Sequence, residues 1–214
     1  MEDILLDGEP RLMPMQGHPT NGDYHVCNEF IKLRDKFNVK KIIECGSCCG
    51  GTSKWMGENF EEVITIEINE TFRNICLRRI NGLTNVKSIL GDSVNHLPNI
   101  LSNSKNNIII FLDDHWLGAF PLIDELKIIK QSGLIPIIVV HDCFVPNEPN
   151  LGYDIYDGVS ISYETMKPYL DDIYGVDRYS YHYNSDAQST QVKRGVFYCY
   201  PKIDTLDRGY LFIK

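Results

Sequence analysis

The sequence lacks a hydrophobic run long enough to cross a membrane, because no apolar stretch approaches the roughly 20 residues that a spanning helix requires. It also lacks the basic and apolar regions of a signal peptide, since it begins with the acidic segment Met1-Glu2-Asp3-Ile4. From these absences we expect a cytoplasmic protein, in the host cytoplasm if the chain is viral. The sequence leaves open whether it is a free protein, a homo-oligomer or a domain of a larger enzyme.

Basic blocks and regularly spaced cysteines are also missing. The formal net charge is -8 and the acidic residues are scattered, which disfavours nucleic acid as a partner. The seven cysteines, with Cys48 next to Cys49, follow no disulfide or metal-motif spacing, so we expect reduced thiols. Without repeats or linkers, 214 residues of 43% hydrophobic content predict a single domain over residues 1–214.

What the chain does contain is an alternation of short apolar segments with amphipathic ones. We expect strands at 39–45, 63–67, 86–90, 108–112 and 135–140, and helices at 23–37, 52–60, 70–80, 94–101 and 121–131. Such alternation predicts an α/β fold with a parallel sheet covered on both faces. After residue 142 we expect a polar substrate-side loop (143–160), a helix (163–170) and a β-hairpin (179–183 and 196–200), while residues 1–22 form an irregular lead-in.

The most informative segment is residues 41–53, which read KIIECGSCCGGTS. A strand that ends in a glycine turn before a helix is the usual nucleotide-site geometry of open α/β sheets. The glycines Gly46, Gly50 and Gly51 do not follow the Gly-x-Gly-x-x-Gly spacing of dinucleotide sites. Instead, Glu44 precedes the first glycine by two residues, and a carboxylate there suits a cationic ligand such as S-adenosylmethionine.

Acidic side chains also end the second and third expected strands. Glu67 is placed to accept hydrogen bonds from both ribose hydroxyls of a bound nucleoside. Asp92 is placed to accept from an adenine amino group, or else to cap the helix that follows.

Glu44-x-Gly46, Glu67 and Asp92, in this order, resemble the class I S-adenosylmethionine-dependent methyltransferases over roughly residues 38–142. The resemblance implies a Rossmann-like, doubly wound, mostly parallel seven-stranded sheet with a C-terminal antiparallel hairpin. It also implies that the turn at Gly46 flanks the methionine part, Glu67 holds the ribose and Asp92 lies near adenine. The expected cofactor-binding residues are Glu44, Gly46, Ser47, Gly50, Thr52, Glu67, Asn69, Asp92, Ser93 and Asp113.

The fourth and fifth strand ends carry further ligand-capable side chains. Asp113, Asp114 and His115 follow one strand, and His141 and Asp142 end the next. Because parallel strands open onto one edge of the sheet, we expect these side chains to converge and to hold a divalent ion, Mg²⁺ or Mn²⁺. The alternative is that Asp142 caps a loop and that the histidines only form hydrogen-bonded pairs with aspartates.

These strand ends are similar to those of metal-dependent sugar O-methyltransferases of the macrocin and mycinose type and their cephalosporin-hydroxylase-like relatives. The resemblance implies Asp113, His141 and Asp142 as metal ligands and His115 as the catalytic base. From the mechanism we also expect Asp114 to orient His115. The chain departs from that group at His141, where a carboxylate is more common.

Several functions remain compatible with these residues. The first is an O-methyltransferase whose acceptor is a sugar or glycan hydroxyl, and the second is one whose acceptor is a catechol-like small molecule. A nicotinamide-dependent oxidoreductase and a non-catalytic nucleoside-binding module are weaker alternatives. Arg194 is either a surface ion-pair partner or a substrate anchor.

Overall fold

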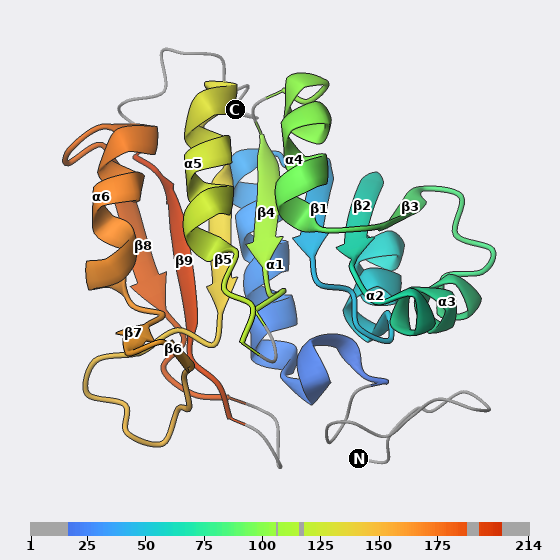
Figure 1. Ribbon diagram of the computed structural model, residues 1–214, viewed down its shortest axis with the longest axis horizontal. Helices are drawn as coiled ribbons and strands as arrows, with labels where there is room; N and C mark the ends of the chain where they lie inside the picture. The colour runs from blue at the N-terminus through green and yellow to red at the C-terminus, as the bar shows by residue number, and fades with distance from the viewer. Residues whose placement is uncertain (1–16, 106, 116–117, 188–192, 203–214) are drawn as a thin grey trace.

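The computed structural model describes residues 17–105, 107–115, 118–187 and 193–202 (Figure 1). Its strands are β1 (Lys41–Cys45), β2 (Glu62–Glu67), β3 (Val86–Leu90), β4 (Ile108–Leu112), β5 (Ile137–His141), β6 (Ile155–Tyr156), β7 (Val159–Ser160), β8 (Tyr179–Tyr183) and β9 (Val196–Pro201). Its helices are η1 (Pro19–Gly22), α1 (Tyr24–Phe37), α2 (Gly51–Asn59), α3 (Glu70–Arg79), α4 (Ser93–Ser102), α5 (Leu122–Ser132) and α6 (Tyr163–Tyr174).

Seven strands form one sheet in the order β3-β2-β1-β4-β5-β9-β8. The first five strands pair in parallel, and β9 is antiparallel to both β5 and β8. This confirms the expected doubly wound sheet and its C-terminal hairpin. The expected loop 143–160 differs in part, because it contains the two-stranded ribbon β6–β7.

Helices cover both faces of the sheet, as the continuous apolar strands require. Figure 1 shows α4, α5 and α6 in front of the sheet, with α1 behind it. On β1, Ile42 packs into the core on the α1 and α2 side, and Ile43 packs into the core on the α4, α5 and α6 side. Successive side chains on a strand point to opposite faces, so each strand contributes to both cores.

The same alternation decides where the polar side chains at the strand ends point. Glu44 shares the face of Ile42 and meets α2, whereas Cys45 shares the face of Ile43 and lies on the α5 side. Beyond β4, Asp113 and Asp114 separate in the same way. The end of the sheet therefore presents two groups of acidic side chains, one on each face.

The described part of the lead-in folds against the start of α2. The backbone N–H of Thr20 donates to the Thr52 hydroxyl at 2.9 Å, and a side chain at Gly51 would collide with the carbonyl of His18, 2.6 Å from the Cβ position. Residues 1–16 lie outside the described residues. Among the helices that the structure describes, none is long and apolar enough to span a membrane.

Candidate active site

The turn between β1 and α2 packs directly against the end of β4. Gly46 adopts a φ of +90°, and a Cβ there would lie 2.4 Å from the carbonyl oxygen of Asp113. The Gly46 N–H donates to the carbonyl of Ile66 at 3.0 Å, which also ties the turn to β2. Only glycine combines this conformation with so close an approach. The expected cofactor turn and the acidic end of β4 are thus neighbours.

Glu67 is held in place by the backbone. Its two carboxylate oxygens accept hydrogen bonds from the N–H groups of Cys48 at 2.8 Å and Asn69 at 2.9 Å. Burial raises the pKa of Glu67, and these two hydrogen bonds oppose the shift. The carboxylate therefore has a fixed position at the end of β2, next to the glycine turn. That is the position expected for a group that accepts from ribose hydroxyls.

Glu44 is fully buried between β1, β2 and α2. One of its oxygens accepts hydrogen bonds from the hydroxyls of Ser53 and of Thr65, the latter at 2.6 Å. Its other oxygen, Oε1, has no hydrogen-bond partner among the described residues. Burial raises the pKa of Glu44 from 4.5 to about 7. Oε1 is therefore the oxygen of Glu44 that the described residues leave without a partner.

Several other residues expected at the cofactor have structural partners. Asp92 accepts from the Val94 N–H at 3.0 Å and caps α4, so the capping interpretation is observed. Asn69 caps α3 through the N–H groups of Thr71 and Phe72. Gly50 is the N-cap residue of α2 and has a φ of +78°. Ser47 and Ser93 are buried. These roles fix the helix starts around the turn.

The ends of β4 and β5 bring together three of the expected metal ligands. His141 Nδ1 lies 3.2 Å from Asp113 Oδ1 and 3.2 Å from Asp142 Oδ1. One ligand atom from each residue lies within 4.8 Å of the other two. His141 is buried, and its Nδ1 makes no hydrogen bond within the described residues. A buried imidazole nitrogen that lies between two carboxylates without a hydrogen bond fits a divalent ion.

His115 joins this group from the same side. Its Nε2 lies 3.4 Å from Asp142 Oδ2, also without a hydrogen bond in the described chain. Burial alone would lower the pKa values of His115 and His141, but the carboxylates of Asp113 and Asp142 outweigh burial and raise both. Burial opposes ionisation of Asp142, yet the imidazoles and Arg194 hold its pKa well below its usual range. The imidazoles and carboxylates of this group therefore favour one another's charged forms.

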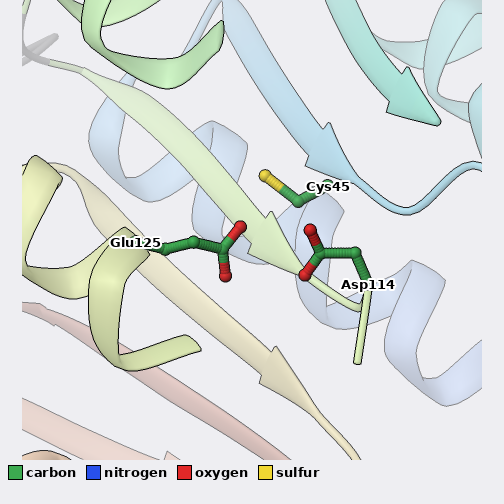
Figure 2. Close-up of side chains that lie close together, drawn as sticks. All are labelled: Cys45, Asp114 and Glu125. Atoms are coloured by element: carbon green, nitrogen blue, oxygen red, sulfur yellow. The ribbon is translucent and has the colours of Figure 1, made fainter. Parts of the chain in front are cut away.

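The side chain of Asp114 does not lie beside His115, as the expected role of orienting His115 would require. Its side chain turns to the opposite face of the sheet, toward Cys45 and Glu125 (Figure 2). The carboxylate beside His115 is that of Asp142 instead. This orientation follows from strand alternation, because adjacent residues of an extended segment point in opposite directions. Residue 116, the tryptophan after His115, lies outside the described residues.

Arg194 and Asp154 complete the site, and the sequence indicates neither role by itself. The Arg194 guanidinium forms ion pairs with both Asp142 and Asp154. Arg194 lies two residues before β9, and its partners come from the end of β5 and from loop 143–160. The two alternatives for Arg194 were a surface ion pair and a substrate anchor. An ion pair is observed, but the Arg194 side chain lies at the site and is only 25% exposed.

No protein-family model matches the sequence, and no curated protein matches it. Comparison of the structure with solved structures gives clear matches. The O-methyltransferase TomG from Streptomyces achromogenes, solved with SAM, is 16% identical, with 81% of this chain and 78% of that chain covered at a TM-score of 0.59. The fold is that of the class I methyltransferases.

Two further matches share this fold. An O-methyltransferase from Bacillus cereus, solved with SAH, is 17% identical, with 91% of this chain and 84% of that chain covered at a TM-score of 0.57. A protein from Staphylococcus aureus, provisionally named a caffeoyl-CoA O-methyltransferase, is 18% identical, with 84% of each chain covered at a TM-score of 0.55. The class I methyltransferase fold thus recurs at low sequence identity.

Proposed function

We propose that this protein is an S-adenosylmethionine-dependent O-methyltransferase that acts on a sugar or glycan hydroxyl with the help of a divalent metal ion. The observation that carries the proposal is the packing of Gly46 on the backbone of Asp113. It puts the turn expected to flank the methionine part directly beside the acidic and imidazole groups expected to receive the acceptor. A methyl donor and an acceptor hydroxyl held by these groups would be neighbours, and positioning is most of what methyl transfer requires.

The residues divide into a cofactor side and an acceptor side. Glu67 would accept from the ribose hydroxyls, and Glu44, whose Oε1 has no hydrogen-bond partner among the described residues, would lie beneath the turn that flanks the methionine part. S-adenosylmethionine, when bound, supplies a methyl group activated by its sulfonium. On the acceptor side, Asp113, His141 and Asp142 would hold Mg²⁺ or Mn²⁺. That ion, when bound, lowers the pKa of a coordinated hydroxyl.

His115 is the residue that we assign as general base. Its Nε2 has no hydrogen-bond donor or acceptor of its own among the described residues and faces the carboxylate of Asp142. Asp142 would stabilise the imidazolium that forms when His115 takes the hydroxyl proton. Positive charge added to the neighbouring carboxylates would remove the main cause that raises the pKa of His115, and so would favour the neutral, proton-accepting form.

An aromatic surface adjoins this base. The ring of Tyr156 contacts His115 edge to face, with 6.1 Å between ring centroids, and stacks on Phe120 at 5.2 Å with an interplanar angle of 11°. Aromatic rings of this kind pack against the apolar face of a sugar. The same surface suits a flat aromatic acceptor, and the name of the Staphylococcus aureus match points the same way. A catechol-like hydroxyl is therefore the second candidate.

The test is methyl transfer from labelled S-adenosylmethionine to a panel of sugars, glycans and catechols, each with and without chelator and added Mn²⁺. Chelator-sensitive methylation of a sugar hydroxyl supports the first candidate, and selective methylation of catechols supports the second. If the protein binds the cofactor but the metal has no effect on methyl transfer to any acceptor, the proposed role of the metal ion is wrong.

A further inference from the structure

A second group of ligand-capable side chains lies on the opposite face of the sheet from His141. Cys45 ends β1, Asp114 follows β4, and Glu125 lies in the first turn of α5. Figure 2 shows the three side chains converging from these three elements. One atom from each lies within 4.8 Å of the other two. Cys45 and Glu125 are completely buried, and Asp114 is partly exposed, which leaves access from the end of the sheet.

The polar atoms of this group are poorly satisfied. Both carboxylate oxygens of Glu125 and Oδ1 of Asp114 are buried without a hydrogen-bond partner among the described residues. The hydroxyl of Ser93, which starts α4 and is 3% exposed, is also unpartnered. A buried polar group left unpaired is destabilising, and a buried carboxylate left unpaired is more so. This many unsatisfied atoms in one place indicates a missing positive group.

The electrostatics agree with the geometry. Burial raises the pKa values of Glu125 and Cys45 well above their usual range, and the Asp114 carboxylate raises that of Glu125 further. Two carboxyls and a thiol therefore face one another without a compensating cation from the described chain. A bound cation would relieve both the desolvation of these groups and their mutual repulsion.

We propose that Cys45, Asp114 and Glu125 bind a divalent ion that accepts thiolate ligands, Zn²⁺ being the best match. Zn²⁺ binds sulfur and carboxylate oxygen at about 2.0–2.3 Å in a tetrahedral arrangement, so its ligands lie roughly 3–4 Å apart. The observed spacing of at most 4.8 Å requires only small shifts. The Ser93 hydroxyl or a water would complete the four ligands. The thiolate argues against Mg²⁺ and Ca²⁺, which prefer oxygen ligands alone.

Such an ion would connect β1, the end of β4 and α5 at one point. Asp114 stands between Asp113 and His115 in the sequence, so the ion would fix the short segment that carries both of these residues. It would be a structural ion on the α5 side of the sheet, separate from the group around His141 on the other side. The inference rests on the packing of these side chains and does not depend on the proposed methyl transfer.

Cobalt is the probe that separates this site from the other one. Co²⁺ bound to a thiolate gives a sulfur-to-metal charge-transfer band in the near ultraviolet, which ligation by Asp113, His141 and Asp142 cannot produce. We expect the full chain, titrated with Co²⁺ after chelator treatment, to show this band with one equivalent bound, and Zn²⁺ to abolish the band by displacement. A wild-type protein that shows no band and retains no zinc would overturn the proposal.

Variants then identify the ligands. Cys45→Ser should lose the band, whereas Cys143→Ser should keep it, although Cys143 is equally buried and adjoins Asp142. Glu125→Gln is nearly isosteric and covers the case in which Cys45→Ser does not fold. It should weaken Co²⁺ binding by about tenfold or more, the scale of losing metal-site contacts. A band that persists in Cys45→Ser, or unchanged affinity in Glu125→Gln, would contradict the assignment.

Discussion

Asp142, at the end of β5, forms an ion pair with Arg194, which lies two residues before β9. The contact joins residues that are 52 positions apart in the sequence. Arg194 also pairs with Asp154, so its guanidinium ties loop 143–160 to the end of the sheet. One of the proposed metal ligands is thus already neutralised by a cation of the chain itself.

The first prediction concerns competition between Arg194 and a metal ion for the carboxylate of Asp142. Arg194→Gln should increase the affinity for Mn²⁺, because Asp142 then no longer divides its charge between Arg194 and the ion. Calorimetric titration of Mn²⁺ measures the change, and we expect a tightening of about threefold to tenfold. Lys193→Gln is the matched control, since the neighbouring Lys193 pairs with the exposed Asp186. Equal or weaker Mn²⁺ binding by Arg194→Gln would show that Arg194 does not oppose the ion.

The second prediction tests the base. His115→Ala should lower turnover by about 10²–10⁴-fold, the range typical of general acid–base catalysis, with nearly unchanged affinity for S-adenosylhomocysteine. Turnover and calorimetry on the same protein separate these effects. His96→Ala provides a control, because His96 lies on α4 and outside the group at the ends of β4 and β5. Wild-type turnover in His115→Ala would rule out the assignment.

The third prediction is a pH effect on stability that arises from Glu44. Its pKa is raised from 4.5 to about 7 in the folded protein, so the fold favours the neutral carboxyl. The stability that this carboxyl contributes is complete below pH 4.5 and is lost as the pH rises through about 7. Glu44→Gln should therefore stabilise the protein more at about pH 8 than at about pH 5, by on the order of 1–3 kcal/mol.

Urea unfolding of wild type and Glu44→Gln at both pH values measures this difference. Glu61→Gln, in which an exposed carboxyl is replaced, should show little dependence on pH. The same stability difference for Glu44→Gln at both pH values would mean that Glu44 is not held in its neutral form.

The fourth prediction concerns the acceptor. Tyr156→Leu removes the aromatic ring between His115 and Phe120, and should raise the KM for the acceptor with little change in cofactor affinity. The expected increase is about fivefold or more, equivalent to roughly 1 kcal/mol of lost ring contact. Tyr156→Phe keeps the ring and loses only the hydroxyl that donates to Asp154 at 3.1 Å, so it should retain most of the affinity. An unchanged KM in Tyr156→Leu would place the acceptor elsewhere.

Most of the fold could be predicted from the sequence because the strands are continuous apolar runs separated by amphipathic helices. Strands β3, β4 and β8 begin and end at the residues expected from the sequence. The ribbon β6–β7 could not be anticipated, since two-residue strands have no periodicity to detect. Helix α6 continues to Tyr174, beyond the expected end at residue 170, and Leu170, Ile173 and Tyr174 are buried against the sheet.

The convergence of the candidate site residues could also be predicted from the sequence. The orientation of Asp114 was predicted wrongly, and the reason is physical. Parallel strand ends meet at one edge, so the approach of Asp113, His115, His141 and Asp142 could be inferred from order alone. The direction of Asp114 required the register of β4 as well. Glu125 resembles an ordinary acidic residue of a helix start, and the contacts of Arg194 depend on how distant loops fold, which no local pattern records.

The most direct test of the proposed S-adenosylmethionine site is calorimetric titration of S-adenosylhomocysteine into the wild type, Glu67→Ala and the control Glu61→Ala, with and without Mn²⁺. We expect micromolar binding by wild type and Glu61→Ala and its loss in Glu67→Ala, because Glu67 would hold the ribose. Absence of binding by the wild type under both conditions, or equal binding by Glu67→Ala, would contradict the methyltransferase site.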